Sequence, residues 1–315
     1  MKIFNSIPKP LVKKLQRLFR WLLACAAAWI LWKKWQENPV EADGWQIWQI
    51  TAACGLAATG LLIESLVWWL PARRIGPLRL FDAFRNTLAF MYYQIFISSG
   101  LSEWSARYFQ FEEKHTKRRS ASVILAVQTS KWIVRLFLSG ILLWLVPTIL
   151  PEALPSGWLA ALFFLLAALA MICLVWPEKL QLALGVKWSA KISAYVAQRG
   201  ERIFPLLPVL LLSALKVALD TIALTLLIHP SASFDMNTFQ QLYLLCASFH
   251  VLAGFLPSLG PADGVLRGAV GSFYFVGEPV EVKMAAASIF LLWIFNVALP
   301  GALGGLLQLF RKGNS

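Results

Sequence analysis

The sequence predicts an all-α, polytopic membrane protein with six full transmembrane helices plus two re-entrant helical hairpins arranged as an inverted repeat. These eight hydrophobic elements would form a single membrane domain over residues 1–315. Composition supports this fold class because 58% of the residues are hydrophobic and 14% are charged, whereas about 25% are charged in soluble domains. The mean hydropathy of the chain is +0.64. A short polar motif that occurs once in each half supports the repeat.

Six segments are apolar over the roughly 20 residues that a helix needs to cross the hydrocarbon of a bilayer. These segments are residues 16–35, 46–70, 121–147, 157–176, 203–228 and 282–309. Two further apolar stretches, at about 83–99 and 239–257, each lead directly into one copy of the repeated motif. These two stretches are either full spans or the entering arms of hairpins.

The charges of the loops favour hairpins. Six basic residues and no acid precede Trp21, which predicts a cytoplasmic N-terminus because basic loops stay on the cytoplasmic side. If 83–99 crossed the membrane, the basic segment 112–119 would lie outside and break this rule. A hairpin that enters from the cytoplasm and returns keeps 112–119 inside. A second hairpin at about 239–276, entering from outside, then also leaves the C-terminus in the cytoplasm.

This topology divides the chain into two halves, at approximately 1–150 and 151–315, each with three spans and one hairpin. Because the hairpins enter from opposite sides, the halves are related as an inverted-topology repeat. Many secondary transporters have this plan, and their binding sites lie near the midplane of the membrane.

The repeated motif reads Ser-x-Gly-x-x-acid-x-x-x-Arg and stands at both expected hairpin tips. Its members are Ser98, Gly100, Glu103 and Arg107 in the first half, and Ser258, Gly260, Asp263 and Arg267 in the second. Glycine permits the turn at the tip, and an acid and an arginine four residues apart share one face of a helix. An arginine near a helix N-terminus suits a phosphate group. The alternative is that each acid–arginine pair only stabilises its own hairpin.

Five further charges stand inside apolar spans, where an isolated charge is costly and functional roles are common. They are Glu64, Lys131, Arg135, Lys216 and Asp220. Lys216 and Asp220 are four residues apart and are expected to pair. Lys131 and Arg135 are expected to meet Glu64, Glu103 or a lipid phosphate. His250, in the second hairpin, is interpreted as a hydrogen-bonded structural histidine.

Several function classes are not indicated by the sequence. The net charge of +13 is explained by basic loops at an anionic membrane surface, so no nucleic-acid partner is expected. The four cysteines stand singly in apolar runs without metal-ligand spacing, and no nucleotide-binding loop or hydrolase motif occurs. We therefore expect no cofactor, no metal and no catalytic residue.

The run FLPSLGPADGVLRGAVGSFYFVGEPVEVKMAAASIFLLWIFNVALPGALGGLL, residues 255–307, resembles a known family signature. It is similar to the C-terminal part of the lysylphosphatidylglycerol synthase transmembrane-region family, also called flippase-like. Pro257, Gly260, Pro300 and Gly304 carry this similarity. In the first half, the glycine–acid turn followed by Arg107 is also similar to the family pattern.

The resemblance implies a flippase-like protein of the cell inner membrane that moves a polar-headed lipid, anionic or polyprenyl-linked, between leaflets. Arg107, Arg267 and helix N-termini would hold the head group. No soluble aminoacyl-transferase domain is evident, so we expect a transporter and not an enzyme. Two alternatives stay open: a non-catalytic membrane partner or scaffold of a lipid-modifying enzyme, and an integral membrane lipid transferase.

Overall fold

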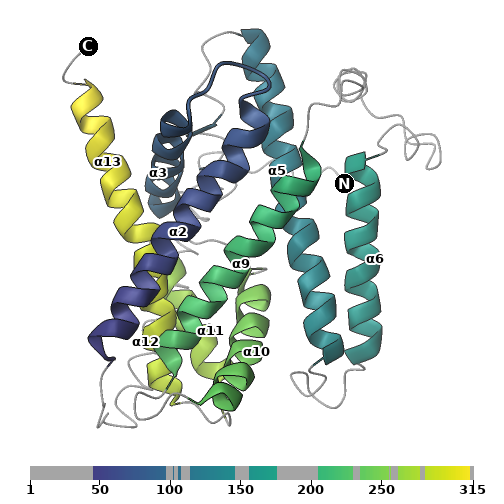
Figure 1. Cartoon of the computed structure of the whole chain (residues 1–315), viewed down its shortest axis with the longest axis vertical. Helices are drawn as coiled ribbons and strands as arrows, with labels where there is room; N and C mark the ends of the chain where they lie inside the picture. Colours follow the sequence, from purple (N-terminus) through teal and green to yellow (C-terminus); the bar gives the residue numbers. More distant parts are fainter. Residues whose placement is uncertain are drawn as a thin grey trace, which may run out of the picture.

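The computed structural model shows a bundle of helices (Figure 1). It describes residues 45–96, 102, 106–107, 114–145, 156–175, 205–229, 235–254, 256, 262–276 and 281–312, which contain no strand. The expected span at 16–35 lies outside these residues. So do five members of the repeated motif: Ser98, Gly100, Glu103, Ser258 and Gly260.

The helices follow the expected apolar segments closely. They are α2 (Ile47–Ala72), α3 (Leu80–Phe96), α5 (Lys114–Leu145), α6 (Ser156–Val175), α9 (Leu206–Ile228), α10 (Met236–Ala253), α11 (Asp263–Tyr274), α12 (Val282–Trp293), η4 (Ile294–Ala298) and α13 (Leu299–Lys312). The last three elements follow one another without a break, and η4 is a π-helical turn. Helix α5 begins within the basic segment 112–119, seven residues before the apolar stretch expected at 121–147.

Four segments of the described chain are long and apolar enough to cross a membrane: Ile47–Ala72, Val123–Leu145, Leu206–Ile228 and Val282–Gln308. They coincide with four of the six expected spans and are compatible with a membrane protein. Helix α6 coincides with another expected span, 157–176, but its apolar stretch Gly157–Ile172 is shorter than the four segments above. Large apolar side chains of α6, including Trp158 and Leu165, are exposed, as expected for a surface that faces lipid. The complete six-plus-two arrangement stays a prediction.

Helices α2 and α9 pack side by side at the centre of the bundle (Figure 1). They contribute to both large apolar clusters of the described chain. One cluster joins α2 and α9 to α10 and α12, around Leu224, Phe249 and Ile289. The other joins α2 and α9 to α3 and α5, around Trp68 and Ile124. The two central helices therefore connect the first half of the chain to the second.

Hydrogen bonds from neighbouring helices fix the end of α9. The last carbonyls of a helix have no partner within the helix and need other donors. The amide of Gln49 on α2 donates to the carbonyls of Leu226 and His229 at 2.8 and 2.9 Å. The Trp45 indole and the Ser288 hydroxyl both donate to the Leu227 carbonyl, at 3.0 and 3.1 Å. The start of α2 therefore lies beside the end of α9, so the two helices run antiparallel.

The start of α10 is fixed by a polar cap. The Asp235 carboxylate accepts hydrogen bonds from the backbone N–H and the hydroxyl of Thr238, at 2.9 and 2.8 Å. These bonds stabilise the charged carboxylate and lower the pKa of Asp235 below its usual value. The cap places the first residue of α10 immediately after the polar segment between α9 and α10.

The expected hairpin arms lie at opposite ends of the bundle. Helix α3 packs against α13, beside the end of α2 (Figure 1). Helices α10 and α11 lie at the other end, where α11 packs against α12 and α10 against α9 and α5. Each arm therefore contacts a long helix of the opposite half: α3 contacts α13, and α10 contacts α5.

Helices α3 and α13 approach closely through glycines. A methyl group on Gly304 would lie 2.2 Å from the backbone oxygen of Leu88, and one on Gly301 would lie 3.0 Å from that of Met91. Gly301 and Gly305 are four residues apart, the small-xxx-small spacing that lets membrane helices pack backbone to backbone. Because a backbone atom stands against Gly304, no side-chain movement can make room for a larger residue there.

We predict that Gly304→Ala lowers the free energy of unfolding by about 1–3 kcal/mol, because it forces α3 and α13 apart. Gly55→Ala is the matched control, since nothing lies within 4 Å of a methyl group at that helical position. The control should raise the stability by about 0.5–1 kcal/mol. Thermal unfolding of both purified variants in detergent measures the difference. Equal midpoints would contradict the close α3–α13 contact.

Candidate functional site: a charged central cavity

A cavity of about 530 Å³ lies between the two halves of the chain. The lining residues come mainly from α2, α3, α5, α9, α10, α11, α12 and the turn η4. Helix α13 packs on two of these elements, α3 and η4. Its titratable lining residues are Glu64, Lys131, Arg135, Lys216, Asp220, His250, Asp263 and Arg267. The cavity therefore gathers charges that stand up to about two hundred positions apart in the sequence.

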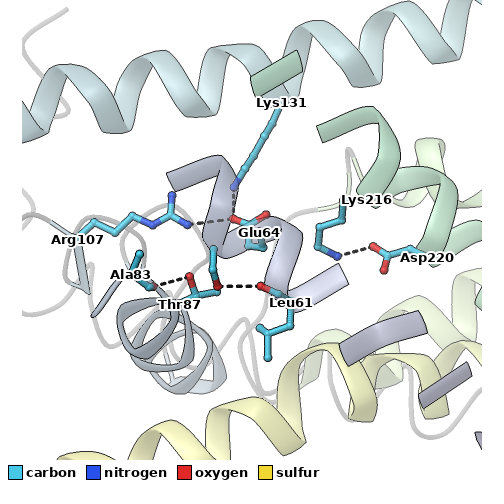
Figure 2. Close-up of polar contacts among 9 residues, drawn as sticks. Leu61, Glu64, Ala83, Thr87, Arg107, Lys131, Lys216 and Asp220 are labelled. Carbon is cyan, nitrogen blue, oxygen red and sulfur yellow. Dashed lines mark hydrogen bonds and ion pairs between the residues drawn. The ribbon is translucent and has the colours of Figure 1, made fainter. Parts of the chain in front are cut away.

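Glu64 on α2 holds two cations. Its carboxylate accepts a hydrogen bond from Arg107 Nη2 at 3.0 Å and another from Lys131 Nζ (Figure 2). The pairing of Lys131 with Glu64, one of three possibilities from the sequence, is confirmed. Arg107 is 0% exposed, and its guanidinium lies 4.9 Å from the ring centre of Trp68 and 5.4 Å from that of Phe90. Arg107 is therefore buried and contacts Glu64 without lining the cavity itself.

Asp220 on α9 is the centre of a second cluster. Lys216 Nζ lies 2.7 Å from its Oδ2, which confirms the expected pair (Figure 2). Asn296 Nδ2 donates to Oδ1 at 3.2 Å, and His250 Nε2 lies 3.8 Å from Oδ2. Asn296 belongs to η4, and π-helical turns are frequent at functional sites because they redirect side chains.

The second-half motif forms a third cluster at the start of α11. Arg267 Nε donates to Asp263 Oδ2 at 2.9 Å, which confirms the pair expected from the spacing of four residues. Asp263 is buried in the first turn of the helix, where a negative charge is favoured by the helix dipole. Trp293 packs on Gly264, where a methyl group would lie 2.6 Å from the indole. The start of α11 is therefore fixed against α12.

Arg135 connects α5 to the end of α10. It is one helical turn after Lys131, and its Nη1 donates to the Gly254 carbonyl at the end of α10, at 3.4 Å. Its guanidinium also lies 5.6 Å from the Trp132 ring centre. Arg135 and Gly254 both line the cavity. The Arg135 cation therefore lies where the first half of the chain contacts the second half.

The structure brings most of the predicted residues to one place. All five intramembrane charges line the cavity, together with Asp263 and Arg267 of the second motif. Of the acid and the arginine in the first motif, Glu103 lies outside the described residues, and Arg107 contacts Glu64. Sequence reasoning missed the cavity positions of His250 and Asn296. The only signal in the sequence for these two positions was a polar residue inside an otherwise apolar segment.

The described cluster carries an excess of positive charge. Arg107, Lys131, Arg135, Lys216 and Arg267 are five cations against the three carboxylates Glu64, Asp220 and Asp263. With a neutral His250 the net charge is +2. In surroundings of low dielectric, this excess favours an anionic ligand.

Arg107→Gln and Glu64→Gln should each lower the free energy of unfolding by about 3–5 kcal/mol, because each leaves a buried charge with fewer partners. The double variant should cost less than the sum, with a coupling of about 0.5–3 kcal/mol. Denaturant unfolding of the four proteins gives the cycle. Arg79→Gln, at an exposed position, is the control and should change stability by less than about 0.5 kcal/mol. Additive costs would show that Glu64 and Arg107 do not interact.

No protein-family model and no curated protein matches this sequence. The resemblance to the flippase-like family therefore stays a prediction, and the function is argued from the cavity and its charges.

Proposed function

We propose that the chain binds the anionic head group of a membrane lipid in the central cavity and moves that lipid between the leaflets. The observation that carries the proposal is the excess of cations around a cavity that both halves of the chain enclose. A cavity lined by this excess of cations attracts an anion, and phosphate is the anion that lipids supply.

The size of the cavity and the exposure of its cations support a head group. Binding pockets for small molecules usually have about 300–1,000 Å³, and this cavity has about 530 Å³. The side chains of Arg267, Lys131 and Lys216 line the cavity and are 25%, 22% and 19% exposed. Arginine binds phosphate through two parallel hydrogen bonds, which favours Arg135 and Arg267 as the main contacts. Arg107 positions Glu64 from behind.

The arrangement of the hairpin arms supports movement between leaflets. Helix α3 lies at one end of the bundle, and α10 and α11 lie at the other. In the inverted repeat that we propose, the first hairpin faces the cytoplasm and the second faces the opposite side. The loop charges favour cytoplasmic termini in this arrangement, and we propose a cell inner membrane as the location. Acyl chains would stay in the bilayer while the head group passes between the hairpins.

The cavity favours this function over a scaffold, and the product separates it from a transferase. A scaffold for a lipid-modifying enzyme needs a complementary surface but no interior charges. A lipid transferase would use the same cavity and would release a chemically altered lipid. Chromatography of the lipid recovered from reconstituted vesicles separates transport, which leaves the lipid unaltered, from transfer.

Arg267→Gln should slow lipid exchange roughly tenfold or more, because a hydrogen bond to a charged group contributes about 1.5–3 kcal/mol. The purified chain is reconstituted in vesicles with phosphatidylglycerol that carries a fluorescent label on one acyl chain. Dithionite quenching of the outer leaflet then reports the exchange rate. Arg79→Gln, which removes an exposed arginine away from the cavity, should exchange at the wild-type rate.

Two results would contradict the proposal. One is exchange no faster than in protein-free vesicles. The other is an equal rate for wild type and Arg267→Gln, which would show that the cavity arginine does not contact the moving lipid.

A further inference from the structure

Two buried acids stand on the two central helices, and their partners differ in kind. Glu64 on α2 is paired with Arg107 and Lys131. Asp220 on α9 is paired with Lys216 and also faces His250. Histidine is the side chain that gains or loses a proton near neutral pH. Of the two acids, Asp220 therefore has a neighbour whose charge can change.

The groups around His250 decide when it holds a proton. From α9 it faces Asp220 and Lys216, from α5 Arg135, and from α11 Arg267. Glu64 of α2, Lys131 of α5 and Asp263 of α11 line the same cavity. Burial of the imidazole is the strongest factor against a positive charge on it, the three nearby cations also oppose that charge, and Asp220 favours it. An anion bound among Lys216, Arg135 and Arg267 would offset the field of these cations and so favour protonation of His250.

Protonation would also change the partner of Asp220. The present distance of 3.8 Å between His250 Nε2 and Asp220 Oδ2 is longer than a hydrogen bond. A protonated His250 can donate from Nε2 to that carboxylate with a small side-chain movement. Lys216, which now holds Asp220 at 2.7 Å, would then be able to turn toward the cavity. Each proton that enters would supply one more cation for the bound anion.

We propose that His250 and Asp220 form a proton-binding site that fills together with the anionic head group. This inference rests on the proposed function and names the second species that the cavity binds. The proton comes from water in the cavity and is bound at His250 Nε2, and the lipid phosphate is bound by the cations around it. A lipid head group with one negative charge and one proton are neutral together. Their joint movement avoids carrying net charge across the hydrocarbon.

The test is calorimetric titration of the purified full chain with short-chain phosphatidylglycerol, in buffers of different ionisation enthalpy. The difference between buffers gives the number of protons taken up for each lipid bound. We expect uptake of up to one proton between about pH 6 and 8, with affinity falling about tenfold per pH unit where uptake is complete. His250→Gln should bind the lipid without proton uptake and with an affinity that no longer depends on pH in this interval.

Two further variants keep the test decisive. His229→Gln changes a histidine at the end of α9, outside the cavity lining, and should take up protons like the wild type. Asp220→Asn leaves His250 in place but removes the acid that stabilises its proton, so it should reduce the uptake. Binding with no proton uptake by the wild type, or with unchanged uptake by His250→Gln, would overturn the coupling alone. No binding by the wild type would overturn the proposed function as well.

Discussion

Charges inside an apolar helix bundle need partners, and this constraint organises the centre of the protein. Glu64 and Asp220 stand on α2 and α9, the two helices that join the halves of the chain, and both carboxylates are buried. Glu64 pairs with Arg107 and Lys131, which approach it from outside these two helices. The ion pairs therefore hold the helices around the cavity in register. A buried pair contributes little net stability, but the loss of one partner is costly.

Packing places this charged centre between two apolar clusters. Leu224 and Phe249 belong to the cluster on one side, and Trp68 and Ile124 belong to the other. The glycine face of α13 lets α3 approach without side chains between the backbones. At the far end, the packing of Trp293 on Gly264 fixes the start of α11 and with it the Asp263–Arg267 pair. The cavity is thus bounded by rigid helix contacts, while its polar wall includes residues of both halves.

The part of this architecture that could be predicted from the sequence is the part with a local signal. Hydropathy located the four helices that can cross a membrane, because burial in lipid requires an unbroken apolar run. The spacing of four residues predicted the Lys216–Asp220 and Asp263–Arg267 pairs, because such residues lie on one helix face. The contact between Arg107 and Glu64 joins segments 43 positions apart and has no such signal. The same holds for His250, since its sequence neighbours do not show which helices α10 will face.

The π-helical turn η4 was also beyond local reasoning. A run of apolar residues predicts a helix, but the extra residue in one turn depends on what the helix packs against. Here the turn carries Asn296, whose amide reaches Asp220. The polar contacts of the cavity therefore depend on the crossing of several helices, and these crossings are tertiary features.

The central claim is that the cavity selects an anionic lipid head group. Native mass spectrometry of the purified chain, titrated with an equimolar mixture of phosphatidylglycerol and phosphatidylcholine with the same acyl chains, tests it most directly. The account predicts that phosphatidylglycerol adducts dominate and that Arg135→Gln removes the preference. Equal adducts of the two lipids with the wild-type chain, or a preference that survives in Arg135→Gln, would contradict it.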